Sequence, residues 1–181
     1  MSLPHALLTA LVEQPGSGSE LAGRFDRSIG YFWHATHQQI YRELARLEEA
    51  GWVEALPAEL GRGRKKVYCI LSAGRDELGR WLSESTQPQP LRDEMMVRLR
   101  AAAAVGASSS LADEVRRRLP LHLEKLETYR QIEARDFSQP PSTQAAQLQR
   151  LVLQAGIAYE SYWVDISRKA LEILEPPSTG E

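Results

Sequence analysis

The sequence predicts a mostly α-helical chain with one small β-hairpin, arranged as two domains at residues 1–85 and 91–175. Three observations favour this arrangement. Apolar residues recur every three or four positions along most of the chain, two short β-prone runs lie close together, and a proline-bearing polar segment follows them. With 181 residues, 43% of them hydrophobic and 25% charged, the chain can form one large domain or two small ones.

Composition narrows the class of protein. A single cysteine excludes a disulfide framework and fits a reducing compartment, so we expect a cytoplasmic protein. The first 16 residues lack the basic n-region of a signal peptide, and no apolar run approaches the length of a membrane span. The net charge of −2 gives no global reason to expect nucleic acid, so any basic footprint must be local.

The first 25 residues predict two short helices. Ser2 and Pro4 favour a helix start, and Pro15-Gly16 ends that helix. Its expected buried face consists of Leu3, Leu7, Leu8, Leu11 and Val12. Ser17 and Glu20 then have capping-box spacing, and Leu21 and Phe25 supply the buried face of a second helix.

A third helix and a hairpin follow. Thr36 and Gln39 repeat the capping-box spacing, and Gly51 suits the position just after the helix, where a positive φ is needed. The inward residues are expected to be Ile40, Leu44 and Leu47. The runs "WVEAL" and "KVYCIL", joined by "PAELGRGRK", predict a hairpin with a long glycine-bearing loop.

A fourth helix, capped by Ser72, is expected to bury Leu78, Trp81 and Leu82. Two helices, a capped helix, a hairpin and another helix occur in the order of a winged helix-turn-helix, in which the hairpin is the wing. Small α+β modules of other kinds share this order.

The second half of the chain predicts helices only. Residues 84–91 form a junction, residues 91–105 a helix that ends at "GASSS", and Ser110 starts a long helix in which Pro120 predicts a kink or a break. The last helix repeats apolar residues every three or four positions: Leu148, Val152, Ala155, Tyr159, Tyr162 and Ile166, widened by Leu151, Ala158 and Trp163. So much apolar surface predicts a dimerisation domain, with a second copy of the chain as the simplest partner.

The outward face of the third helix carries the functional hypothesis. His37, Gln38, Tyr41 and Arg42 lie at its N-terminal end, the end that a recognition helix inserts into the major groove. Glutamine pairs bidentately with adenine and arginine with guanine. A polar, solvated face is the alternative interpretation.

Two flanking features favour contact with DNA phosphates. The segment from Leu60 to Arg75 is rich in basic residues up to Lys66, and such a hairpin tip suits phosphate contact. "SGS" at residues 17–19 offers hydroxyls and backbone N–H groups at a helix start, although ordinary capping explains it equally well. The expected phosphate contacts are Ser17, Ser19, Thr36, Arg62, Arg64, Lys65 and Lys66.

The stretch from residue 2 to residue 84 resembles the PadR family of bacterial transcriptional regulators, most specifically in "FWHATHQQIYREL" and "KKVYCILSAGRDEL". "LRDEMMVRLR" and the helical region after it look like the longer subfamily, which has a separate C-terminal dimerisation domain. The resemblance implies a homodimeric repressor whose third helix reads a palindromic operator. It also implies release from DNA by phenolic acids or other small hydrophobic molecules.

Aromatic residues supply a hypothesis for such an effector. Tyr31 and Trp33 precede the third helix, and Tyr159 and Trp163 belong to a cluster on the last one. They either pack in the core and the dimer or line an aromatic pocket between the domains, where Arg24 or His37 pairs with a ligand carboxylate.

Enzyme chemistry is not expected. His34 and His37 have no carboxylate or cysteine to complete a metal site, Cys69 is expected to be a buried strand residue, and motifs of catalysis or cofactor binding are missing from the sequence. The competing function is a winged-helix interaction module that dimerises without binding DNA, which the pI of about 6.1 also fits.

Overall fold

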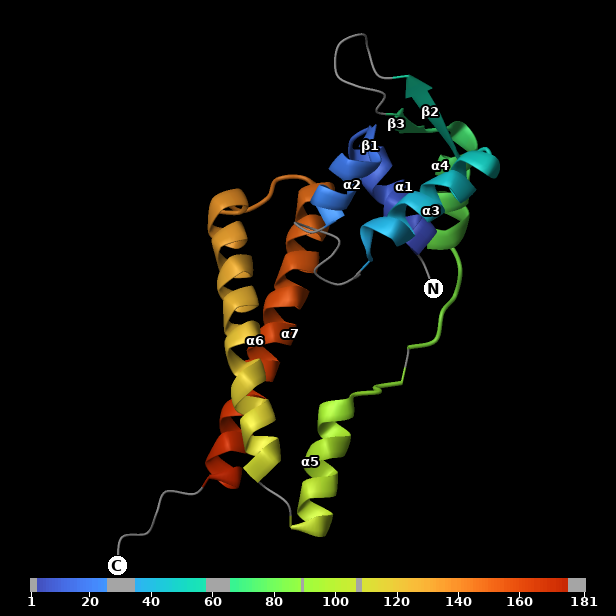
Figure 1. The fold of residues 1–181 in the computed structure, drawn as a ribbon. Coiled ribbons are helices and arrows are strands. Elements are labelled where there is room, and N and C mark those ends of the chain that lie inside the picture. The colour runs from blue at the N-terminus through green and yellow to red at the C-terminus, as the bar shows by residue number, and fades with distance from the viewer. Residues whose placement is uncertain (1–2, 26–34, 58–65, 89, 107–108, 176–181) are drawn as a thin grey trace, which may run out of the picture. The chain divides into compact units, whose positions relative to one another are not determined.

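The computed structural model describes residues 3–25, 35–57, 66–88, 90–106 and 109–175. It is mostly helical with one small sheet, which confirms the predicted fold class (Figure 1). The elements are α1 (Leu3–Glu13), β1 (Gly16–Ser17), α2 (Gly18–Phe25), α3 (His37–Glu49), β2 (Val53–Pro57), β3 (Lys66–Ile70), α4 (Ser72–Leu82), α5 (Glu94–Val105), α6 (Ser109–Asp136) and α7 (Gln144–Leu174). They form two compact units, Met1–Pro88 and Gln89–Glu181, which are taken in turn.

The sheet of the first unit contains the predicted hairpin and one unpredicted strand. β2 pairs antiparallel with β3, with Val53 opposite Ile70 and Pro57 opposite Lys66. β1 pairs with the other edge of β3, so the strand order is β1-β3-β2. Two residues are too few to show a period of two, and they lie in a segment that the sequence predicts as a turn and a helix cap. The missed strand therefore left no recognisable pattern.

The core of the first unit lies between α1, α2, α3 and the sheet. The inward residues predicted for α3 are at most 1% exposed, as are Leu7, Leu8, Leu11, Leu21 and Phe25. Val12, expected on the buried face of α1, is 41% exposed, because it lies at the rim of that face. Gly51 has φ +71°, so the predicted left-handed residue after α3 is confirmed.

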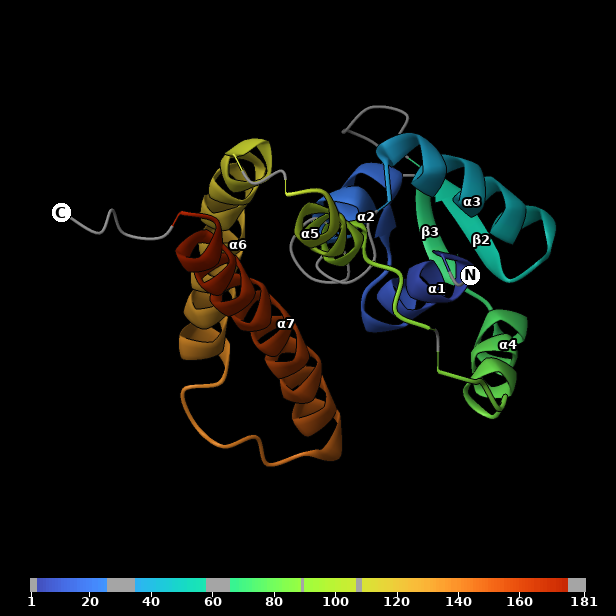
Figure 2. The ribbon, with the colours of Figure 1, turned by 90° about the horizontal axis from the view of Figure 1, so that it is seen from below.

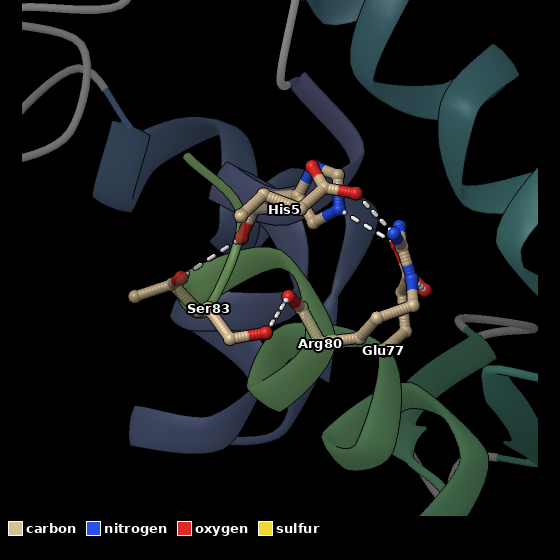
Figure 3. A network of polar contacts seen from close by, with 6 residues as sticks. His5, Glu77, Arg80 and Ser83 are labelled. Carbon is tan, nitrogen blue, oxygen red and sulfur yellow. Dashed lines mark hydrogen bonds and ion pairs between the residues drawn. The ribbon is translucent and has the colours of Figure 1, made fainter. Parts of the chain in front are cut away.

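Polar contacts attach α4 to α1 (Figure 3). His5 Nε2 donates a hydrogen bond to Glu77 Oε1 at 3.0 Å, and its ring stacks on Trp81 with centroids 4.5 Å apart. Arg80 Nε donates to Glu77 Oε2 at 2.6 Å. The hydrogen bond from Arg80, followed by the one from His5, lowers the pKa of Glu77 to about 2. The carboxylate therefore stays charged at the junction of the two helices.

Two expectations for α4 are wrong. The N-cap position is Leu71, whose side chain makes no capping hydrogen bond, and Ser72 is the first helical residue. Leu82 is 77% exposed, because Leu78 and Trp81 already occupy the face that packs on the rest of the unit. An apolar residue at the end of a helix can follow the helical period and still lie beyond the core.

In the second unit α6 and α7 run side by side in opposite directions (Figures 1 and 2). Their ion pairs fix this antiparallel arrangement: His122 with Glu160, Glu133 with Arg150, and Arg116 with Glu175. α6 is one continuous helix through Pro120, so of the predicted kink or break the break does not occur. Pro120 is exposed, which leaves its ring and the missing N–H at the surface of a helix that α7 supports along its length.

The helix α5 and a close contact complete this unit. Asp93 Oδ1 accepts the Met96 N–H at 3.1 Å and caps α5, which begins three residues later than predicted and ends at Gly106 with φ +71°. The Tyr129 ring of α6 lies against Gly156 of α7, where a Cβ would come within 3.1 Å of the ring. Glycine at this position lets the two helices approach closely.

Candidate nucleic-acid interface

The start of α3 is held by a capping box. Thr36 Oγ1 accepts the Gln39 N–H at 3.2 Å, and the Thr36 N–H donates to Gln39 Oε1 at 2.8 Å. Each of the two residues thereby satisfies a backbone donor that a helix end leaves without an intrahelical partner. The first turn of α3 is therefore fixed in place, as the sequence predicts.

Opposite faces of α3 differ in chemistry. The inward face consists of Ile40, Leu44 and Leu47, all buried in the core. The outward face of the first two turns holds four exposed residues, His37, Gln38, Tyr41 and Arg42. The structure thus brings together the four side chains that the sequence predicts for base contact, on a helix whose position the core determines.

Tyr41 is positioned by the start of α2. Its ring lies over Gly18, where a Cβ would come within 2.9 Å of Tyr41 Cδ1 and closer still to Cε1. Tyr41 nevertheless remains 47% exposed. The sequence gives no sign of this contact, because it depends on the angle between two helices that are separated by residues 26–36. Gly18 therefore contacts one side of the Tyr41 ring, and the rest of the ring is exposed to solvent.

Lys66 at the start of β3 supplies a cation beside α3. Its Nζ lies 3.5 Å from Glu48 Oε2, and its side chain is 63% exposed. Nearby Tyr68 is buried, and this burial, with a smaller contribution from the Glu48 carboxylate, raises the pKa of its phenol. Because both partners of the Lys66–Glu48 pair are solvated, the ion pair holds Lys66 only weakly.

The segment at residues 17–19 differs from the prediction. Ser17 is 4% exposed, and its N–H and its hydroxyl both donate to Glu20 Oε2 at 2.8 Å. The predicted capping box is confirmed, but it uses the very groups that were expected to bind phosphate. It also places a carboxylate at the start of α2. The structure therefore does not favour a phosphate contact by Ser17, because this residue is buried. Ser19 and Thr36 remain exposed.

Arg24, predicted to bind an effector, has a structural contact. Its Nη1 donates to the carbonyl oxygens of Gln14 at 2.6 Å and Ala10 at 3.2 Å, at the C-terminal end of α1. A cation is stabilising at the C-terminus of a helix, where carbonyl groups lack N–H partners. Arg24 is therefore held against α1 in this conformation, and its role as an effector contact stays a prediction.

The other predicted effector residues divide into two pairs. Tyr31 and Trp33 lie outside the described residues, as do three of the predicted phosphate contacts, Arg62, Arg64 and Lys65. Tyr159 and Trp163 lie together on α7, with ring centroids 6.5 Å apart. Both border a pocket within the second unit, together with Arg118, His122 and Ser167. The sequence did not indicate these three residues, because contacts between α6 and α7 join positions about 40 residues apart.

The described part of the chain contains neither a metal-ion site nor a membrane-spanning helix. Residues 3–25, 35–57, 66–88, 90–106 and 109–175 contain no group of three histidine, cysteine or acidic side chains that could hold a metal ion. None of the helices in these ranges is long and apolar enough to cross a membrane.

Comparison with known proteins assigns a family to each part of the chain. Residues 7–80 match the family model described as the transcriptional regulator PadR-like family, and residues 91–175 match the one described as virulence activator alpha C-term. A probable transcriptional regulator of Mycobacterium tuberculosis (strain ATCC 25618 / H37Rv) is 44% identical over 97% of this chain and 98% of its own length.

Solved structures show the same architecture. The Vibrio cholerae virulence activator AphA is 31% identical, with a TM-score of 0.78 over 96% of this chain and 98% of that one. Bacillus subtilis PadR in complex with operator DNA is 24% identical, with a TM-score of 0.79 over 97% of this chain and 100% of that one. In complex with p-coumaric acid it is 23% identical, with a TM-score of 0.72 over 94% and 97%. At these two identities the likeness shows a shared fold.

Proposed function

The chain belongs to the PadR-like family of transcriptional regulators, and from this premise we propose that it binds operator DNA through the first two turns of α3. The observation that carries the proposal is the exposed polar end of α3, fixed by its capping box over a buried apolar face. In this proposal four residues contact bases: His37, Gln38, Tyr41 and Arg42. The crystal structure of Bacillus subtilis PadR with operator DNA supports it.

Contacts to phosphate are proposed for a smaller set than the sequence suggested. Ser19, Thr36 and Lys66 keep this role because all three are exposed. Arg62, Arg64 and Lys65, outside the described residues, keep it on the basic character of their sequence. Ser17 is omitted because it is buried.

A homodimer is the proposed functional unit. Five residues, spaced by three or four positions, form one apolar stripe along α7: Leu148, Val152, Ala155, Tyr159 and Tyr162. All five are exposed in the single chain, Val152 by 48% and Tyr159 by 57%. Continuous apolar surface of this kind marks an interaction site. A second copy that covers the stripe would also give two wings for a palindromic operator, whose half-sites lie roughly 34–36 Å apart.

Val152→Glu tests the dimer. The variant should elute as a monomer with the molar mass of one chain by light scattering, and it should bind the operator poorly. The control is Arg168→Glu, since Arg168 is exposed on the opposite side of α7 by helical geometry. A Val152→Glu protein that stayed dimeric would remove α7 from the interface.

Regulation by a small molecule is the second part of the proposal. We infer that the protein is a cytoplasmic repressor that an aromatic or hydrophobic effector releases from DNA, with Tyr159 and Trp163 as the effector contacts. The complex of Bacillus subtilis PadR with p-coumaric acid supports an effector of this kind. Release requires the effector to bind the DNA-free conformation more tightly, since equal affinity shifts no equilibrium.

Footprinting on the DNA upstream of the protein's own gene tests the proposed function. The expected result is two protected half-sites one helical turn apart, together with higher expression of a reporter gene when the protein is absent. Protection without repression would overturn the repressor role alone. A winged-helix module that only binds proteins would protect no sequence, and this is the outcome that would overturn DNA binding.

A further inference from the structure

Tyr68 in the middle of β3 combines a buried ring with an accessible hydroxyl. The residue is 7% exposed and belongs to the core of the first unit. Neighbouring strands flank it, because it pairs with Gly16 of β1 on one side and with Ala55 of β2 on the other. Within the described residues its hydroxyl makes no hydrogen bond, and it is not one of the buried atoms that lack a partner. The hydroxyl therefore reaches solvent at the edge of the core.

The neighbours of this hydroxyl belong to the proposed DNA interface. Side chains alternate along a strand, so Lys66 and Tyr68 lie on the same face of the sheet. Lys66 Nζ lies 3.5 Å from Glu48 Oε2 of α3. The phenol interacts electrostatically with Glu48, with Lys66 and with Tyr41 of α3. The hydroxyl thus lies beside Tyr41, which is proposed to contact a base, and beside Lys66, which is proposed to contact a phosphate.

The phenol of Tyr68 keeps its proton. Burial of the ring, followed by the Glu48 carboxylate, raises its pKa above the ordinary value of 10.0, and the opposing effect of Lys66 is smaller. A protonated phenol is a hydrogen-bond donor without charge. At neutral pH Tyr68 therefore offers one neutral donor at the surface.

A donor of this kind suits an oxygen of a DNA phosphate. Tyrosine is one of the side chains that donate to phosphate oxygens in DNA complexes. The ring of Tyr68 is already fixed in the core, so little conformational freedom is lost when its hydroxyl binds. The neighbouring Lys66 adds a positive charge on a flexible chain, which attracts the phosphate but does not fix its position.

We propose that the Tyr68 hydroxyl donates a hydrogen bond to a backbone phosphate of the operator, the same phosphate that Lys66 contacts. This inference rests on the proposed function and adds to it a contact that carries no charge. Contacts to phosphates set the register of a protein on the duplex. Because the ring of Tyr68 is part of the core, this contact fixes the position of the whole first unit, and with it the position of α3 in the groove.

Glu48 determines the charge around this contact. Its carboxylate repels a phosphate, and the Lys66 ammonium offsets that repulsion. In the proposed complex Lys66 lies between the two anions. Glu48→Gln should therefore tighten binding to every DNA sequence, because it removes the like charge and keeps the size of the side chain.

Tyr68→Phe in the full-length protein removes the hydroxyl and keeps the ring. Fluorescence anisotropy measures binding to a duplex from the DNA upstream of the protein's own gene and to a scrambled duplex of the same composition. The variant should bind both duplexes more weakly by the same factor, about tenfold for each subunit in contact, because a hydrogen bond to a charged group is lost. The salt slope should stay unchanged, since a neutral hydroxyl releases no counterion.

Single methylphosphonates in the operator identify the phosphate. Each of them replaces one charged phosphate oxygen by a methyl group. Neutralising one position in each half-site should weaken binding of the unmodified protein, and the same change should cost less in Tyr68→Phe and in Lys66→Met. A purely structural role of Tyr68 would leave the profile along the operator unchanged in shape.

Cys69→Ala is the matched control. Cys69 is the next residue along β3 and lies on the opposite face of the sheet. This variant loses one sulfur atom, as Tyr68→Phe loses one oxygen, and it should bind both duplexes as the unmodified protein does. Thermal melting checks the fold, and Tyr68→Phe should melt with the unmodified protein, because its hydroxyl has no partner in the described residues.

Several results overturn the inference. Among them are equal affinities of Tyr68→Phe and Cys69→Ala, a loss in Tyr68→Phe that is confined to the operator sequence, and a methylphosphonate profile of unchanged shape. Weaker binding by Glu48→Gln would place the phosphate elsewhere. If the unmodified protein binds with the expected salt dependence and Tyr68→Phe binds equally well, the inference alone is wrong. An unmodified protein that binds neither duplex would overturn the proposed function as well.

Discussion

The two adjacent glutamines of α3 should have separable roles. Gln38 is exposed and makes no hydrogen bond to another described residue, so Gln38→Ala should leave stability almost unchanged. If Gln38 pairs with an adenine, its removal should cost about 1–3 kcal/mol of discrimination at one operator position, which is about 5- to 150-fold in affinity. Affinity for operators already changed at that position should stay the same.

Gln39→Ala is the matched control and should show the opposite result. It removes the acceptor of the Thr36 N–H bond at 2.8 Å, which should cost about 1 kcal/mol of folding free energy. For a unit of 88 residues this lowers the melting temperature by about 4–8 °C. At a temperature where it is folded, the variant should keep its base preference.

The assay is competition binding with a set of operators that vary at one position at a time, combined with thermal melting of each variant. Base discrimination lost in Gln39→Ala and kept in Gln38→Ala would refute the assignment of the outward face of α3 as the reading surface. Uniform loss of affinity across all operators in Gln38→Ala would refute it equally.

Two further predictions concern the first unit. Gly18→Ala should push the Tyr41 ring from its position and weaken operator binding. In a double-mutant cycle, the variant that carries both Gly18→Ala and Tyr41→Ala should bind no more weakly than Tyr41→Ala alone. Additive losses of binding free energy would show that Gly18 does not act through Tyr41. Glu77→Gln should lower the melting temperature at neutral pH. The folded-state pKa of Glu77 is depressed to about 2, so the stabilisation by its carboxylate is complete above the ordinary pKa of 4.5 and is lost as pH falls towards 2. The melting temperatures of the variant and of the unmodified protein should therefore converge at low pH. A constant difference between them would contradict the ion-pair account.

Local patterns predicted most of the fold. The capping boxes at Ser17 and Thr36, the left-handed Gly51 and the hairpin runs each depend on residues near one another in the chain, and the structure contains all of them. The errors depend on distant surroundings. Leu82 follows the helical period but has no partner beyond the core, and β1 forms only by pairing with β3, which lies far along the chain.

The candidate sites were predictable to different degrees. The outward face of α3 follows from helical periodicity once the inward residues are identified. The structural contact of Arg24 was not predictable, because its partners are backbone carbonyls at the end of another helix, and no residue type indicates such a contact. The pocket of the second unit joins His122 to Glu160 and Trp163 across two long helices, a pairing that depends on how α6 and α7 align.

The salt dependence of affinity for the DNA upstream of the protein's own gene tests DNA binding most directly. The logarithm of the binding constant should fall linearly with the logarithm of salt concentration, with a slope of about −0.9 for each phosphate contacted. Lys66→Met should weaken all sequences alike and flatten that slope by about one, since the pair with Glu48 leaves Lys66 solvated and able to reach a phosphate. Two results would contradict the proposed interface. One is an affinity that does not change with salt, and the other is a Lys66→Met variant whose affinity and salt slope equal those of the unmodified protein.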